Sequence, residues 1–141
     1  MRPQSCKSKG RRLQQRVVAD ILQAFPSLDD DDCRSTSMGA GGEDVQLSPA
    51  ARARLPLSLE CKNVEKINVW QCLQQCAANA PPGATPCLVF SRNRAPTYAV
   101  VPWPELLALY ARPPAPDQLP PRVAALVQEL HALCAPGDAE A

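Results

Sequence analysis

Three residues of this chain have the types and the spacing needed for metal-assisted hydrolysis. Glu60 and Lys62 stand two positions apart in a segment that alternates apolar and polar residues, so a β-strand would present both side chains on one face. Asp44 stands at the start of a preceding candidate strand. The two carboxylates could together bind a hard divalent cation, Mg²⁺ or Mn²⁺ as its substitute, with the carbonyl of Cys61 as a third ligand.

The ion and the lysine would have separate roles in such a site. A bound cation polarises a phosphoryl oxygen and acidifies a water molecule, while the Lys62 ammonium would orient this water or neutralise charge that develops on the phosphate. The same residues also fit an exposed ion pair on a sheet face. A loop with three glycines precedes Asp44, however, and such a loop lets a backbone approach phosphates closely. We therefore favour the metal site.

Hydrophobic spacing predicts the elements that would position these residues. Apolar residues recur every three or four positions in the first helix, and strict alternation around Glu60 predicts a half-buried strand. In chain order we expect a helix over 11–25, a loop over 29–43, a strand over 44–47, a turn over 48–54, a strand over 57–62, a helix over 67–78, strands over 87–91 and 98–101, and a helix over 103–110. This order predicts an α/β fold with a mixed central β-sheet flanked by helices.

The two ends of the chain differ in composition from this central part. Residues 1–10 contain several Lys and Arg and no acid, which predicts a basic N-terminal arm. After the folded part, residues 11–110, we expect a proline-rich linker over 111–121, an amphipathic helix over 122–135 and a disordered tail over 136–141. The length of 141 residues fits one domain with such attachments.

Composition excludes several other classes of protein. The seven cysteines are odd in number and no secretory segment opens the chain, so we expect an intracellular protein of the cytoplasm or nucleoid with reduced thiols. The only histidine, His131, lies near the C-terminus, which leaves nucleophilic catalysis by Ser or Cys without a convincing base. No apolar run approaches the ~20 residues of a membrane span. The net charge of +1 does not by itself favour nucleic acid.

The segment GGEDVQLSP (41–49) followed by LPLSLECKN (55–63) resembles the signature of the PD-(D/E)xK nuclease superfamily. The likeness is strongest to small phage-type and Holliday-junction-resolvase-like members, so a virus-encoded protein acting in a host cell falls within the expectation. It extends to KGRRLQQRVVADIL (9–22) and NVWQCLQQCAAN (68–79), and thus to about 9–110. The resemblance implies a restriction-endonuclease-like fold, with Asp44 and Glu60 as metal ligands and Lys62 as the catalytic lysine.

The resemblance also assigns two glutamines and exposes two departures. Gln75 would lie over the active site, and Gln15 stands where junction resolvases commonly carry an acidic residue on the first helix. A glutamine lacks that negative charge, which should weaken metal affinity. Glu43 replaces the proline of the motif and ranks below Asp44 as a ligand. Trp70 belongs to an apolar helical stripe, so we expect it in the core rather than stacked on an unpaired base.

We therefore predict a metal-dependent DNA endonuclease that is selective for branched DNA in recombination, repair or replication. So short a chain has little room for a base-reading domain, and backbone contacts suffice to recognise DNA shape. A resolvase would also need to form a symmetric homodimer. The residues expected to bind DNA are Lys7, Lys9, Arg11, Arg12, Arg52 and Arg54. Two alternatives stay open, a non-catalytic nucleic-acid-binding protein with the same fold and an interaction protein that recruits a partner through its C-terminal part.

Overall fold

The computed structural model describes residues 3–37, 40–114 and 118–134. The chain divides into two compact units, Met1–Leu106 and Leu107–Ala141. The first unit contains α1 (Pro3–Ala24), β1 (Cys33–Ser35), β2 (Val45–Leu47), α2 (Pro49–Arg54), β3 (Leu57–Asn63), α3 (Val69–Asn79), β4 (Thr85–Ser91) and β5 (Tyr98–Val100). Helix α4 (Trp103–Ala111) begins in this unit and ends in the second, which also contains α5 (Pro121–Cys134).

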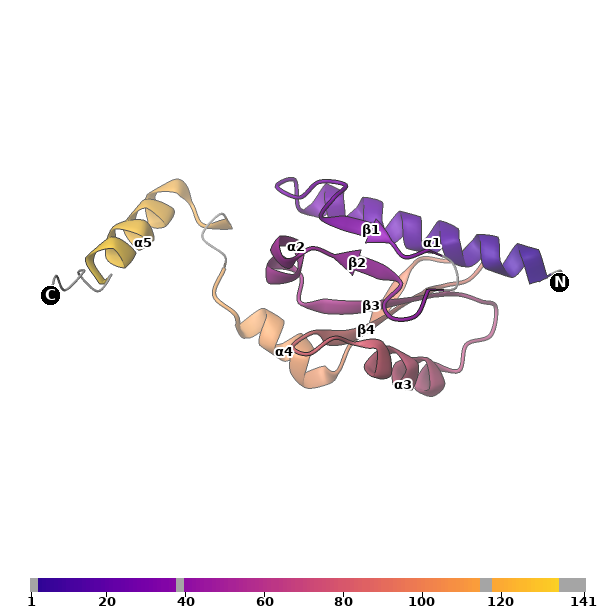
Figure 1. The fold of residues 1–141 in the computed structure, drawn as a ribbon. Coiled ribbons are helices and arrows are strands. Elements are labelled where there is room, and N and C mark those ends of the chain that lie inside the picture. Colours follow the sequence, from indigo (N-terminus) through magenta and orange to yellow (C-terminus); the bar gives the residue numbers. More distant parts are fainter. Residues whose placement is uncertain (1–2, 38–39, 115–117, 135–141) are drawn as a thin grey trace, which may run out of the picture. The chain divides into compact units, whose positions relative to one another are not determined.

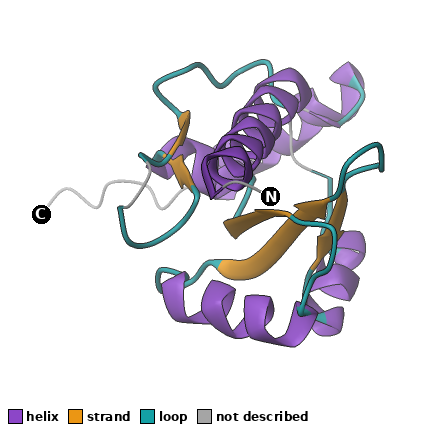
Figure 2. Ribbon diagram, turned by 90° about the vertical axis from the view of Figure 1, so that its right-hand side faces the viewer, coloured by secondary structure: helices purple, strands orange, loops and turns teal. Residues whose placement is uncertain are grey.

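A three-stranded mixed sheet forms the middle layer of the first unit. Its order is β3-β4-β5, with β3 parallel to β4 and β5 antiparallel to β4. Helix α1 lies against one face of this sheet and α3 against the other (Figures 1 and 2). On the α1 side the buried core consists of residues from the helix and all neighbouring strands, namely Leu13, Val17, Ile21, Cys33, Val45, Leu59, Cys61, Cys87 and Val89. The prediction of an α/β protein with a mixed sheet and flanking helices is confirmed.

Strands β1 and β2 form a separate antiparallel pair, with Cys33 opposite Leu47. This pair reaches the edge of β3 through Asp44, whose backbone N–H donates to the carbonyl of Leu59 at 3.0 Å. The prediction that residues 29–43 form only a loop is wrong at β1. Three residues are too short for a recognisable pattern, and their conformation depends on pairing with β2.

Within residues 48–54, where a turn was predicted, Pro49–Arg54 form helix α2. The Ser48 side chain accepts a hydrogen bond from the backbone N–H of Ala51, and Pro49 occupies the first helical position. Ser48 Oγ also donates to Asp32 Oδ1 at 2.6 Å, which ties the start of the helix to the end of the preceding turn. A capping serine followed by proline is a recognised start signal for a helix, so the sequence contained this information.

Strand β3 is buried on both faces over its centre, although alternation predicted one exposed face. Ser58 and Glu60 are only 1% and 2% exposed because α3 covers this side of the strand. The Cys76 thiol of α3 donates to the carbonyl of Ser58 at 3.4 Å. The prediction of a core position for Trp70 is also wrong, because its side chain is 80% exposed and Cys76 occupies the buried side of α3 instead.

Lys7 and Lys9 of the predicted basic arm are part of α1, which begins at Pro3 rather than near Arg11. Lys7, Lys9, Arg11 and Arg12 therefore lie on successive turns of a helix and not on an extended arm. No helix among the described residues is long and apolar enough to cross a lipid bilayer.

The second unit contains the predicted C-terminal helix as α5, whose exposed apolar residues are Val123, Leu126, Leu130 and Leu133. Part of the proline-rich linker, residues 115–117, and the tail predicted over 136–141 lie outside the described residues.

Candidate active site

Asp44 is held against the centre of the Glu60–Lys62 segment. Its Oδ2 accepts a hydrogen bond of 2.7 Å from the backbone N–H of Cys61, the residue between the predicted ligand and the predicted lysine. In an extended strand the N–H and C=O of one residue point to the same edge, so the carbonyl of Cys61 also points toward the Asp44 side. The structure thus brings together three residues that are separated in sequence.

Glu60 and Lys62 form an ion pair in which Lys62 Nζ lies 2.7 Å from Glu60 Oε1. The Glu60 side chain is 3% exposed, whereas that of Lys62 is 29% exposed. Both side chains leave the same face of β3, as the sequence predicted, but this face is the one that α3 covers. The Lys62 ammonium is therefore paired with a buried carboxylate while part of the Lys62 side chain remains accessible to solvent.

Gln14, not the predicted Gln15, is the glutamine beside Asp44. Gln14 is 8% exposed and hydrogen-bonds the Asp44 carboxylate through its side chain. Because an ionised carboxylate only accepts hydrogen bonds, the Gln14 amide nitrogen is the donor. Among the described residues, the buried Gln14 Oε1 atom has no hydrogen-bond partner. A buried acceptor without a donor is costly, which marks this atom as one that a ligand could satisfy.

The electrostatic environment of these groups is mixed. Burial raises the pKa of Asp44 above its usual value, and the negative charge of Glu60 adds to this effect, while the Cys61 N–H bond and the Lys62 charge oppose it. Partial burial acts to lower the pKa of Lys62, but the hydrogen bond and charge of Glu60, together with the charge of Asp44, outweigh burial and raise it. Lys62 is therefore an ammonium at neutral pH. It can donate hydrogen bonds and neutralise charge, but it cannot remove a proton.

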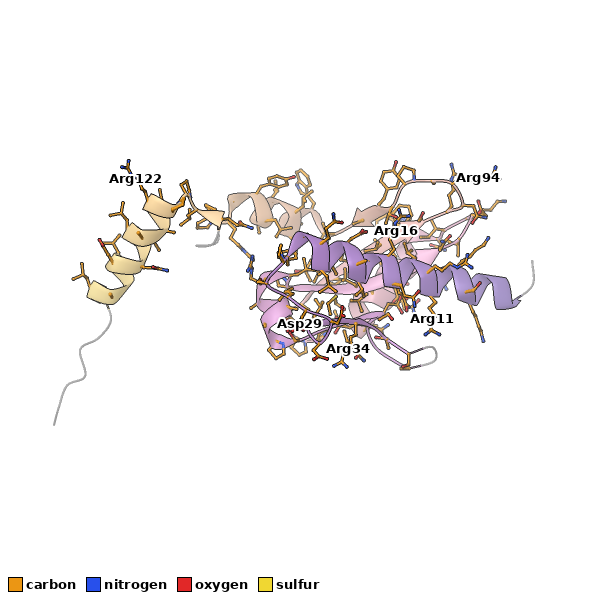
Figure 3. The ribbon with its side chains drawn as sticks, turned by 90° about the horizontal axis from the view of Figure 1, so that it is seen from above. Arg11, Arg16, Asp29, Arg34, Arg94 and Arg122 are labelled. Atoms are coloured by element: carbon orange, nitrogen blue, oxygen red, sulfur yellow. The ribbon has the colours of Figure 1, made fainter. Side chains whose placement is uncertain are left out.

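An open cavity of about 250 Å³ lies over Gln14, Asp44 and Lys62, whereas the buried Glu60 does not line it. Two of the predicted DNA-binding cations, Lys7 and Arg11, line it from α1. Figure 3 shows Arg11 projecting from the surface of this helix. The other lining residues are Gly10, Gln14, Thr36, Ser37, Ala40, Asp44, Cys61 and Lys62. The cavity is therefore lined by one carboxylate, one side-chain amide and three cationic side chains. This arrangement is suited to a phosphate that binds near a metal ion.

The other predicted site residues lie away from this cavity. Gln15 and Gln75 are exposed on α1 and α3, and neither lines the cavity. Lys9 and Arg12 are on the same turns of α1 as Lys7 and Arg11 but do not line it either.

Arg52 and Arg54, both predicted to bind DNA, make contacts within the fold. Arg52 is paired with Glu43 at 2.6 Å and donates to the carbonyl of Leu57 at 2.9 Å. The Arg54 guanidinium lies over the ring of Phe25, 5.4 Å from its centroid. These contacts join α2 to the elements around it, so the two arginines have structural roles.

The donor set beside Asp44 fits a hard cation. The Asp44 carboxylate, the partnerless Gln14 Oε1 and the Cys61 carbonyl are oxygen ligands, which Mg²⁺ and Mn²⁺ prefer. Within the described residues no group of three or more His, Cys, Asp or Glu side chains is placed to hold a metal ion, so amide and backbone oxygens and water would complete the coordination. The resemblance pointed to the neighbouring Gln15, whereas Gln14 lies in the buried stripe of α1 with Val17 and Ile21.

No protein-family model, curated protein or solved structure matches this chain. The functional interpretation therefore depends on the geometry described above.

Proposed function

We propose that this protein is a metal-dependent DNA endonuclease of the PD-(D/E)xK type that hydrolyses phosphodiester bonds. The observation that carries the proposal is the 2.7 Å hydrogen bond between Asp44 and the backbone between Glu60 and Lys62. This bond brings the Asp44 carboxylate to the segment that carries Glu60 and Lys62, from which Asp44 is separated in sequence. The partnerless Gln14 Oε1 at the same place supports a bound cation.

The fold proposed with this function is the restriction-endonuclease-like one. In support, β3 and β4 are parallel, α1 packs on one face of the sheet, and the junction at Asp44 extends the sheet toward β2 and β1. In this arrangement Asp44 lies at the edge of β3 and lines the open cavity.

Asp44, Gln14 and the Cys61 carbonyl would hold Mg²⁺, with Glu60 beside them. When bound, the ion supplies Lewis acidity toward a phosphoryl oxygen and a water molecule. Lys62 remains charged and would stabilise negative charge on the phosphate. Its pairing with Glu60 fixes the position of the ammonium, so little reorganisation is needed when substrate binds.

DNA would reach this site across the N-terminal half of α1. Lys7 and Arg11 line the cavity and would bind phosphates that flank the scissile one, without reading the base sequence. This mode of binding favours recognition of DNA shape. We therefore retain branched DNA as the substrate class and a symmetric homodimer as the active form.

A cleavage assay with purified protein tests the proposal. End-labelled four-way junctions, flaps and linear duplexes of matched sequence are incubated with Mg²⁺, with Mn²⁺ and with EDTA. We expect metal-dependent cuts on at least one branched substrate and none in EDTA. Absence of cleavage on every substrate with both metals contradicts the proposal.

One observation favours a second candidate, a nucleic-acid-binding protein without catalysis. The Glu60 side chain is 3% exposed and already paired with Lys62, so its carboxylate is less accessible than that of Asp44. A protein that binds junctions through Lys7 and Arg11 but does not cut them would fit this candidate.

A further inference from the structure

A second cavity, of about 320 Å³, opens at the ends of β3 and β4. Apolar and aromatic side chains form most of it, with a few polar groups at its margin. Its principal lining residues are Val64, Ile67, Phe90, Ser91, Arg92 and Tyr98. A partly apolar cavity of this size with few polar groups is typical of a site for a small planar or drug-sized group.

The cavity is connected to the candidate active site by the register of the sheet. Lys62 of β3 is opposite Phe90 of β4, and Phe90 is opposite Tyr98 of β5. Residues that are paired across strands share one face, so these three side chains form a row. With strands spaced about 4.8 Å apart, the Tyr98 backbone lies roughly 10 Å from that of Lys62. One nucleic-acid strand could therefore contact both ends of the row.

The aromatic part of the row is suited to stacking. The rings of Phe90 and Tyr98 lie 6.0 Å apart with planes inclined by 32°. Tyr98 is nevertheless 58% exposed, because β5 forms the edge of the sheet. Exposed aromatic rings beside a positively charged surface are the usual platforms for unpaired bases.

The loop that closes the cavity is held by hydrogen bonds. The backbone N–H of Asn93 donates to Glu65 Oε1 at 3.3 Å, and Ser91 Oγ donates to the carbonyl of Ala95 at 3.2 Å. Arg94 has a φ of 58°, so the loop turns sharply between β4 and β5. Figures 1 and 3 show this loop at the same end of the sheet as the N-terminal half of α1.

Charge distinguishes a base from a phosphate as the occupant. The Glu65 carboxylate forms part of the cavity wall, and it would repel a phosphate. Arg92 at the margin and Arg94 on the loop can instead neutralise the backbone of a strand whose base enters the cavity. The apolar wall formed by Val64 and Ile67 also suits a base and not an anion.

We propose that this cavity binds one unpaired nucleobase, stacked on Tyr98, of a DNA strand whose adjacent phosphate lies at Lys62. The inference deepens the proposed nuclease function and rests on it. It gives the preference for branched DNA a physical cause, because flaps and opened junctions supply unpaired bases and a closed duplex does not.

The test measures DNA affinity in EDTA, where no cleavage occurs. A flap with 2-aminopurine at its unpaired positions is compared with a fully paired duplex, using wild-type protein, Tyr98→Ala and Tyr98→Phe. Tyr110→Ala is the matched control, since Tyr110 is 86% exposed and lies in the second unit. We expect Tyr98→Ala to weaken flap binding about 5- to 150-fold and to abolish quenching of the 2-aminopurine. Tyr98→Phe and Tyr110→Ala should bind within about twofold of wild type, and duplex affinity should be unchanged.

Flap binding by Tyr98→Ala that equals wild type would overturn the proposal, and so would an equal loss of flap and duplex affinity. The outcome is independent of catalysis. Flap binding that depends on Tyr98, without cleavage in Mg²⁺, would support the base site and contradict the nuclease function. Cleavage in Mg²⁺ together with wild-type flap affinity in Tyr98→Ala would support the nuclease function and contradict the base site.

Discussion

The Asp44 carboxylate accepts a 2.7 Å hydrogen bond from the backbone N–H of Cys61. This bond joins the start of β2 to the strand that carries Glu60 and Lys62. Asp44 also hydrogen-bonds Gln14, so α1, β2 and β3 meet at one carboxylate. The candidate site is therefore located where three elements join, and changes in the chain there can be tested separately for stability and for metal binding.

Asp44→Asn should preserve the fold while removing the response to metal. Burial raises the pKa of Asp44, which means that its charge is unfavourable in the folded protein, and an asparagine can still accept from Cys61. We expect an unfolding free energy equal to or above that of wild type without metal. At a Mg²⁺ concentration of about 100 Kd, wild type should gain about 2.7 kcal/mol and Asp44→Asn almost nothing. If thermal unfolding shows that Mg²⁺ stabilises wild type and Asp44→Asn equally, Asp44 is not a metal ligand.

The neighbouring glutamines of α1 offer a matched pair of substitutions. Gln14→Glu adds a carboxylate beside Asp44, so it should lower stability without metal and increase Mg²⁺ affinity. Gln15→Glu changes an exposed position and should affect neither quantity. Calorimetric titration with Mg²⁺ compares them. An increase in Mg²⁺ affinity in Gln15→Glu but not in Gln14→Glu would show that Gln15, the residue assigned by the resemblance, lies at the metal site and Gln14 does not.

Two pairs of cationic residues on the same turns of α1 can be substituted separately. The comparison distinguishes DNA contacts made in the cavity from non-specific electrostatic attraction between the helix and DNA. The double variant Lys7→Ala/Arg11→Ala removes the cations that line the cavity. It should reduce the slope of log affinity against log salt by about 1.8, at ~0.9 per lost duplex contact. Lys9→Ala/Arg12→Ala removes the same charge from outside the cavity and should change the slope less. Identical slopes for the two variants would show that the cavity does not direct binding.

The buried thiols of the sheet should resist alkylation. Burial raises the pKa of Cys87 to about 12. At pH 8 only about one molecule in ten thousand then carries the reactive thiolate. Mass spectrometry after iodoacetamide treatment should find Cys72, which is only partly buried, modified in the native protein and Cys87 modified only in urea. Native Cys87 that reacts as fast as Cys72 contradicts the burial of β4.

Local sequence patterns were sufficient to predict the elements with the longest repeats. Helix α1 and the alternation of β3 were predicted because apolar residues repeat at a fixed period in each. The same stripe could have identified Gln14, which stands three positions before Val17 and seven before Ile21, both buried. Gln15 is one position outside that stripe.

The burial of Glu60 could not be predicted from β3 itself. Its alternation shows only that Glu60 and Lys62 share a face, and α3 determines whether that face is covered. Helix α3 buries Cys76, a residue type that is often fully buried, and leaves the larger Trp70 exposed. Similarly, the approach of Asp44 to Cys61 depends on β1 pairing with β2, a contact between short segments that leave no periodic signal.

The measurement that tests the central claim most directly is the Mg²⁺-dependent cleavage rate of Lys62→Arg at saturating branched DNA. Arginine keeps the ion pair with the buried Glu60, so the variant should retain its circular dichroism spectrum and DNA affinity, but its planar guanidinium cannot reproduce the point charge of the ammonium. We predict a loss of at least about 100-fold in rate, because the bulkier guanidinium cannot take the position of the ammonium at the phosphate, and loss of one correctly positioned charge-stabilising donor acts on this scale. A folded Lys62→Arg variant that cleaves at the wild-type rate would contradict the assignment of the Asp44, Glu60 and Lys62 group as the catalytic centre.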